Sequence, residues 1–140
     1  MPDSVETSNP SASGASLRPP PVADVLARIR GTARLETAHG SSELTFQAMG
    51  TRCRVSFAGL QPSRTADLVL AWVATFEARY SRFLPDSWVS QINERAGGDW
   101  IELDPEAHQL LGLCSQLVFL TRGILDPSSL PLIRLWDWTQ

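Results

Sequence analysis

The segment FQAMGTRCRVSF contains the pattern that most restricts the fold of this chain. Its apolar residues fall on even positions up to Ala48 and on odd positions from Cys53 onward. Because side chains alternate between the two faces of a strand, this change of parity requires either one inserted residue, as in a β-bulge, or a tight turn. We therefore predict β structure on both sides of Met49, Gly50 and Thr51, with a break in the strand at these residues.

The composition is typical of a soluble protein with one domain. The chain has 140 residues, of which 43% are hydrophobic and 19% charged, and its formal net charge is -3. Because the sequence contains no basic cluster, we do not expect a nucleic-acid partner. We expect the two cysteines, Cys53 and Cys114, to be free thiols on apolar faces of their elements.

The N-terminal part predicts a disordered, Pro- and Ser-rich tail over residues 1–43. It lacks the apolar stretch that a secretory signal or a membrane span requires. Val22, Val25 and Ile29 share one stripe, which predicts a short helix over residues 22–30. We interpret this as a marginal helix in a linker, and the alternative is a partner-binding helix.

Residues 44–140 are expected to form the structured part. Apolar residues at helical spacing from Ala66 to Tyr80 predict a helix, with Ser63 as its candidate N-cap and Pro85 as the residue that prevents its continuation. A second, short helix follows, with Asp86 or Ser87 as its N-cap. Residues 100–103 predict a short strand.

The clearest helix signal begins at Asp104, a candidate N-cap followed by a proline at the first helical position. We expect Gly123 to adopt a left-handed conformation at the C-terminal end of this helix. His108 lies off the apolar stripe, so we interpret it as a solvated helix residue.

The last residues form a dense apolar cluster without helix or strand periodicity. Its members are Leu132, Ile133, Leu135, Trp136 and Trp138. Because several large apolar side chains exposed together are a liability, we expect another segment or chain to cover them. On this basis we interpret the chain as the front part of a larger domain.

Three ordered sequence pieces carry a resemblance to a known family. They are AMGT after a strand, then YSRFLPDSWVSQIN, then TRGILDPSSLPLIRLWDW. In this order and spacing they resemble the N-terminal portion of the ApbE family, the FAD:protein FMN transferases, over about residues 44–138. The resemblance implies an α+β, T-fold-like domain, with packed helices on a mixed or antiparallel sheet, of which residues 44–140 would be an incomplete N-terminal portion.

The resemblance implies an enzyme that uses Mg²⁺ to transfer FMN from FAD to a Thr hydroxyl of a flavin-acceptor protein, with release of AMP. The residues implied to bind FAD are Met49, Phe83, Ile124, Leu125 and Asp126. Family members usually have Tyr where Phe83 stands, and Ile124 and Leu125 also depart from the family pattern. For Asp126, the alternative is a structural Asp-Pro turn.

The resemblance assigns no catalytic and no metal-binding residue in this chain, because the family's Mg²⁺ ligands correspond to later sequence. We therefore expect the chain alone to be inactive and a missing C-terminal half to be a partner. The alternative function is a non-catalytic binding or assembly module, or a remnant, that docks through the C-terminal Trp/Leu cluster. Many family members are exported lipoproteins, but this sequence has no apolar leader and no lipobox Cys, so we predict a cytoplasmic protein.

Overall fold

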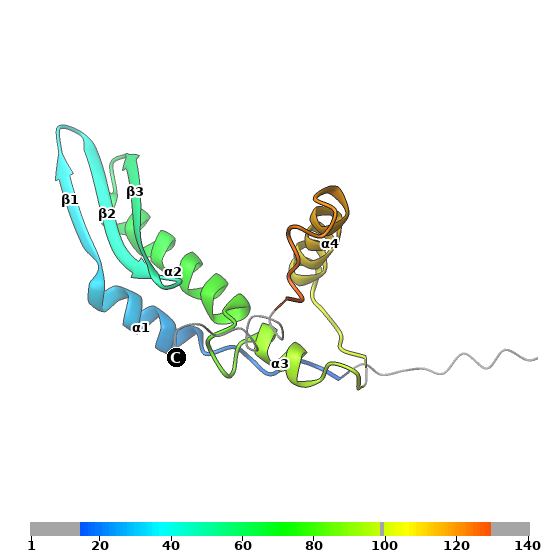
Figure 1. Cartoon of the computed structure of the whole chain (residues 1–140). Coiled ribbons are helices and arrows are strands. Elements are labelled where there is room, and N and C mark those ends of the chain that lie inside the picture. Colours follow the sequence, from blue (N-terminus) through cyan, green and yellow to red (C-terminus); the bar gives the residue numbers. More distant parts are fainter. Residues whose placement is uncertain (1–14, 99, 130–140) are drawn as a thin grey trace, which may run out of the picture. The chain divides into compact units, whose positions relative to one another are not determined.

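The computed structural model describes residues 15–98 and 100–129 (Figure 1). In chain order its elements are α1 (Val22–Thr32), β1 (Arg34–Ala38), β2 (Ser41–Ala48), β3 (Thr51–Ala58), α2 (Pro62–Tyr80), α3 (Trp88–Glu94) and α4 (Pro105–Leu120). The chain divides into two compact units, residues 1–101 and residues 102–140. Helices and one antiparallel sheet make this an α+β fold, which confirms the predicted fold class.

The first unit contains a three-stranded antiparallel sheet in the order β1-β2-β3. The register of β2 and β3 pairs Phe46 with Cys53, an even position with an odd one, which explains the change of parity in the sequence. Met49 and Gly50 are the loop of this hairpin, with φ angles of 51° and 74°. Two consecutive positive φ angles are typical of a type I′ turn, whose twist matches that of the strands. The break in the strand is therefore a tight turn, and of the two alternatives that the change of parity allowed, the β-bulge is wrong.

The hydrophobic core of this unit lies between β2 and the helices α1 and α2. Along β2 every second residue is buried, so one face of the strand contacts the helices. The buried apolar residues are Val25, Ile29, Leu44, Phe46, Ala48, Ala66, Leu70, Val73, Ala74 and Ala78. Three of the six buried residues of α2 are alanines, whose small side chains permit close packing against the neighbouring elements.

The helix α1 begins at Val22, as predicted, but it is a packed element of the core. Val25 is 3% exposed and Ile29 is 0% exposed, and packing stabilises a helix that is too short to be stable alone. Sequence analysis placed the start of the structured part at residue 44. The described helices and strands begin earlier, at Val22. All five residues of β1 are exposed, so this strand lacks the apolar alternation that would have predicted it. Residues 1–14 of the predicted tail lie outside the described residues.

The N-termini of α2 and α3 test two predicted caps. Pro62 occupies the first turn of α2 and Gln61 is its N-cap residue, so the prediction of Ser63 as the cap is wrong. Proline suits the first helical position, and it starts the helix before the serine. In α3 the cap is Ser87, whose side-chain oxygen accepts a hydrogen bond of 3.1 Å from the amide of Ser90. This confirms one of the two predicted alternatives.

The strand predicted over residues 100–103 is wrong. Only an isolated parallel bridge between Ile101 and Ala15 forms there, and the Trp100 side chain is 82% exposed. Asp104 already caps the next helix, so the segment has little length left for a ladder.

The second unit contains α4, whose start and end follow the prediction. Asp104 Oδ1 accepts a hydrogen bond of 2.8 Å from the backbone amide of Ala107. At the other end Arg122 and Gly123 have φ angles of 53° and 82°, and the Gly123 amide donates to the Val118 carbonyl oxygen at 2.9 Å. This is the bond pattern of a Schellman motif, and it confirms the left-handed Gly123.

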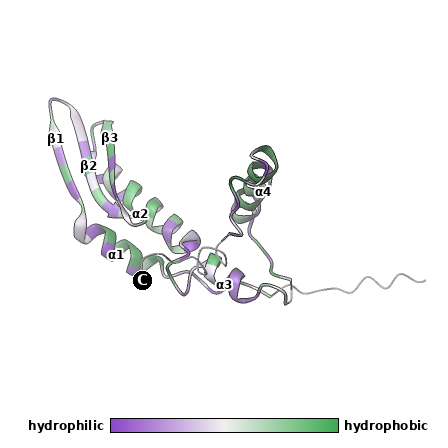
Figure 2. Ribbon diagram, viewed as in Figure 1, coloured by the Kyte–Doolittle hydropathy of each residue, from purple (hydrophilic) through white to green (hydrophobic). Residues whose placement is uncertain are grey.

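Most residues of α4 are hydrophobic, as the green colour along most of its ribbon shows (Figure 2). Among the described residues of this helix only Ala107 is buried, whereas Leu113, Phe119 and Leu120 are exposed. His108 is also exposed, as predicted. The predicted C-terminal Trp/Leu cluster, residues 132–138, lies outside the described residues.

Candidate functional site

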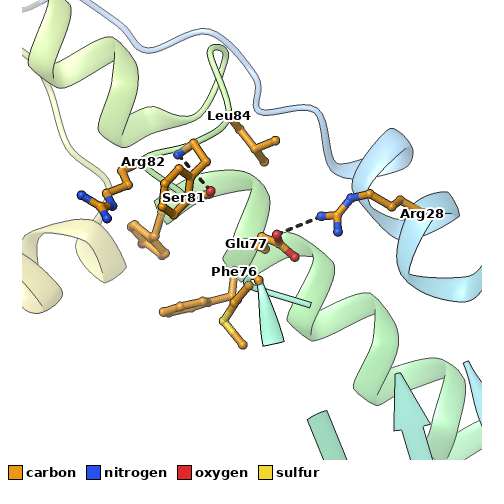
Figure 3. A pocket seen from close by; sticks show the side chains of 10 residues that line it. Arg28, Phe76, Glu77, Ser81, Arg82 and Leu84 are labelled. Carbon is orange, nitrogen blue, oxygen red and sulfur yellow. Dashed lines mark hydrogen bonds and ion pairs between the residues drawn. The ribbon is translucent and has the colours of Figure 1, made fainter. Parts of the chain in front are cut away.

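A cavity of about 470 Å³ opens in the first unit at the C-terminal end of α2 (Figure 3). Its lining comes from α1, from the turn between β2 and β3, from the last turns of α2 and from the loop that follows α2. This volume lies within the range of roughly 300–1,000 Å³ that is common for small-molecule sites. The cavity is therefore large enough to hold one end of a dinucleotide.

Two of the predicted FAD-binding residues, Met49 and Phe83, line this cavity. The fold brings them together from the β2–β3 turn and from the loop after α2. Met49 is 49% exposed and Phe83 is 78% exposed, so a ligand has access to both side chains. The other predicted residues, Ile124, Leu125 and Asp126, belong to the second unit.

The apolar wall of the cavity contains aromatic rings from α2. Trp72, Phe76 and Tyr80 follow one another at intervals of four residues, which places them along one side of the helix. The ring centroids of Phe76 and Tyr80 lie 5.0 Å apart, and those of Trp72 and Phe76 lie 5.8 Å apart. Phe76 and Tyr80 both line the cavity. Such rings provide flat apolar surface against which a planar ligand can stack.

The polar wall of the cavity contains an ion pair between a half-exposed arginine and a buried glutamate on two helices. Glu77 on α2 has a side chain that is only 7% exposed, and its Oε1 lies 2.8 Å from Nη2 of Arg28 on α1 (Figure 3). The other carboxylate oxygen, Oε2, is buried and has no hydrogen-bond partner. Both residues line the cavity. A carboxylate and a guanidinium side by side provide an acceptor and donors for a ligand.

Sequence reasoning missed this pair. Glu77 follows Val73 by four positions and so lies on the apolar face of α2, and a charged residue on such a face is the signal that would have found it. Arg28 lies in the segment that sequence analysis assigned to a tail. Its role depends on the packing of α1 against α2, which no local pattern indicates.

The turn between β2 and β3 places Met49 in an unusual backbone conformation. A positive φ is uncommon for a residue other than Gly, Asn or Asp, and such strain is frequent at binding sites. At Gly50 an added Cβ would meet no atom within 4 Å, so the turn conformation, and not close packing, requires glycine here.

In the second unit, Asp126 forms a local turn. Its Oδ1 accepts hydrogen bonds from the Ser128 hydroxyl at 2.6 Å and from the Ser128 amide at 2.8 Å. The hydroxyl bond, and to a lesser degree the amide bond, lowers the pKa of Asp126 below its ordinary value. These bonds are those of the structural turn that sequence analysis kept as the alternative for this residue.

Comparison with known protein families decides which family this chain belongs to. The ApbE family matches residues 49–140, which is well over half of the chain. The protein is a member of the ApbE family. Membership in this family indicates a flavin-related transferase with flavin and flavoprotein partners. No curated protein and no solved structure matches the chain significantly.

The match begins at Met49, so the ApbE-family region includes the β2–β3 turn, the cavity-lining part of α2 and the loop that contains Phe83. It does not include Arg28, which α1 contributes from outside the matched region. This ApbE-family cavity therefore combines residues of the family region with one residue of the preceding segment.

Mg²⁺ is the metal ion that the resemblance to the ApbE enzymes implies. Within residues 15–98 and 100–129, no group of three or more His, Cys, Asp or Glu side chains is arranged to hold a metal ion. The described part of the chain therefore shows no preformed Mg²⁺ site. None of the helices in this same part of the chain is long and apolar enough to cross a membrane.

Proposed function

We propose that this chain binds FAD in the cavity beside the β2–β3 turn and acts in the transfer of FMN from FAD to a Thr hydroxyl of a flavin-acceptor protein. One observation carries the proposal: Met49 and Phe83, which the family resemblance selects as FAD contacts, line the same cavity. The family match over residues 49–140 supports it at the level of flavin-related transfer.

The cavity residues offer complementary contacts to a flavin or adenine ring. The exposed Phe83 ring and the aromatic wall of Phe76 and Tyr80 provide stacking surface. The Met49 thioether is polarizable and makes favourable contacts with aromatic rings. We propose that these side chains bind and orient FAD. For Ile124, Leu125 and Asp126 the proposed FAD contact rests on the resemblance alone.

In the proposed reaction, the oxygen of the acceptor Thr attacks the phosphorus atom on the flavin side of the pyrophosphate. A phosphorus–oxygen bond forms to Thr, the bond to the adenylate phosphate breaks, and AMP leaves. The hydroxyl proton passes to a base. The contribution that we propose for the described residues is to hold FAD so that the flavin-side phosphate faces the incoming hydroxyl.

Titration of the full chain with FAD, followed by flavin fluorescence and calorimetry, tests the binding step. We expect Met49→Ala and Phe83→Ala each to weaken FAD binding by roughly tenfold, because each removes a contact with the ligand ring. The matched control is Leu60→Ala, because Leu60 is 102% exposed and does not line the cavity. FAD binding that neither cavity variant weakens would show that the site lies elsewhere.

The transfer step is tested with FAD, Mg²⁺ and an acceptor that carries the target Thr. Covalent flavin on the acceptor, detected by in-gel fluorescence together with released AMP, is the result that supports transferase function. Because the resemblance assigns no Mg²⁺ ligand to this chain, binding of FAD without transfer is the result expected of the chain alone, and it does not by itself favour the alternative, a non-catalytic binding module. Absence of FAD binding would contradict the proposed function.

A further inference from the structure

One carboxylate oxygen of Glu77 accepts no hydrogen bond within the fold. Its carboxylate is almost fully buried, and only Oε1 is paired, with Arg28. Oε2 has no hydrogen-bond partner. Buried polar atoms are nearly always paired in folded proteins, because an unpaired one loses its hydration without compensation. The unused oxygen therefore points to a donor that a ligand supplies.

The surroundings of Glu77 indicate what kind of ligand supplies this donor. The guanidinium of Arg28 offers N–H donors directly beside the carboxylate acceptor (Figure 3). The rings of Phe76 and Tyr80 provide the apolar wall of the same cavity. A donor and an acceptor side by side next to aromatic surface fit a planar heteroaromatic ring whose edge carries an N–H beside an acceptor atom.

We infer that Glu77 accepts, through Oε2, a hydrogen bond from a ring-edge N–H of bound FAD, while Arg28 donates to the neighbouring acceptor atom of the same ring. The inference rests on the proposed FAD site. Both ends of FAD have such an edge: the flavin imide N–H lies between two carbonyl groups, and the adenine amine lies beside a ring nitrogen. Glu77 and Arg28 therefore distinguish rings by the hydrogen-bonding atoms at their edge as well as by their shape.

Oε2 is buried, so the donor reaches it only when neighbouring side chains move. Met49 and Phe83 are exposed members of the cavity lining, so their side chains have room to move as the ring enters. In this arrangement Met49 and Phe83 contact the faces of the ring, and Glu77 and Arg28 contact its edge.

The test compares rings with and without the donor, using the full chain. One pair of probes is lumiflavin and 3-methyllumiflavin, and the other is AMP and N6,N6-dimethyl-AMP. We expect the wild-type chain to prefer the unmethylated member of one pair by roughly tenfold or more, because methylation removes a hydrogen bond to a charged group. The pair that shows the preference identifies the end of FAD that Glu77 binds.

Two variants separate this role from a structural one. The double variant Arg28→Met, Glu77→Met removes the ion pair without leaving an uncompensated charge, and it should reduce the preference to within about twofold. The matched control is Asp67→Asn, because Asp67 pairs with Arg30 across the same two helices at 3.0 Å and does not line the cavity. We expect the control to keep the full preference.

The outcomes distinguish this inference from the proposed function. If wild-type protein binds FAD but discriminates within neither pair of probes, the role of Glu77 is wrong and the FAD site stands. A preference that persists in a folded double variant also overturns the inference. If the double variant does not fold, the preference of the wild-type chain within the two pairs of probes still decides whether the inference holds. If neither FAD nor any of the four probes binds, both the inference and the FAD site are wrong.

Discussion

Arg28 Nη2 lies 2.8 Å from Glu77 Oε1, and this contact joins α1 to α2 on the side of the cavity. A second ion pair, between Arg30 and Asp67, joins the same two helices at 3.0 Å. The pairs differ in burial, because the Glu77 side chain is 7% exposed whereas the Asp67 side chain is 63% exposed. An unpaired charge is costly only where water cannot replace its partner.

This difference predicts unequal effects of the same substitution. Arg28→Ala should lower the free energy of unfolding by about 2–3 kcal/mol, because it leaves the Glu77 carboxylate buried without a counter-charge. Arg30→Ala should lower it by less than about 1 kcal/mol, as is usual for an exposed pair. Urea unfolding followed by tryptophan fluorescence measures both values. If both variants lose an equally small free energy of unfolding, another group compensates the buried charge of Glu77 once Arg28 is removed.

The Asp126 turn gives a prediction about pH. Ser128→Ala removes the hydroxyl that is the larger cause of the lowered pKa of Asp126. We expect this pKa to rise toward its ordinary value of 3.8 but to remain below it, since the backbone amide still donates. Titration of the Asp126 carboxyl by carbon NMR measures the change. Ser129→Ala is the control, because only the backbone amide of Ser129 contacts Asp126.

The sign of the stability effect follows from the direction of this pKa shift. A carboxyl whose pKa is lower in the folded state stabilises the fold above its unfolded pKa and loses that contribution as the pH falls through the lowered folded value. Ser128→Ala should therefore weaken the turn at neutral pH and have progressively less effect below about pH 3.8. A pKa of Asp126 that Ser128→Ala leaves unchanged would contradict this explanation.

Local sequence patterns predicted much of the fold where burial follows a period. The parity change at Met49 and Gly50 indicated two strands with a break between them, and the stripe and cap residues of α4 predicted its start and its end. β1 was not predicted, because it is exposed along its whole length and shows no alternation of apolar and polar residues. The isolated bridge at Ile101 was over-interpreted as a strand, since apolar residues near a turn do not by themselves supply a pairing partner.

The candidate site was less predictable than the fold. Met49 and Phe83 were found through the family resemblance, and nothing in their local spacing indicates that they line one cavity. Glu77 and Arg28 were missed because their contact arises only when α1 packs on α2. A site assembled from separate elements depends on tertiary contacts, which periodicity does not report.

The two hairpin turns of the sheet have similar positive φ angles and different first residues. His39 and Gly40, between β1 and β2, have φ angles of 51° and 78°, and Met49 and Gly50 have φ angles of 51° and 74°. Asn is the preferred residue at the first position of such a turn, because its short polar side chain tolerates the left-handed region. Methionine lacks a short polar side chain of this kind, so the turn at Met49 and Gly50 is the more strained of the two.

Met49→Asn should therefore raise the free energy of unfolding by about 0.5–1 kcal/mol and, if the FAD site is correct, weaken FAD binding by roughly tenfold through loss of the thioether contact. His39→Asn is the matched control: histidine already tolerates a positive φ, so we expect a smaller gain in stability, and His39 does not line the cavity, so FAD binding should not change. Thermal unfolding and FAD titration on the same samples give both quantities. A gain in stability without loss of FAD affinity in Met49→Asn would show that the strained methionine serves neither folding nor FAD binding, and the proposed contact would then have to be withdrawn.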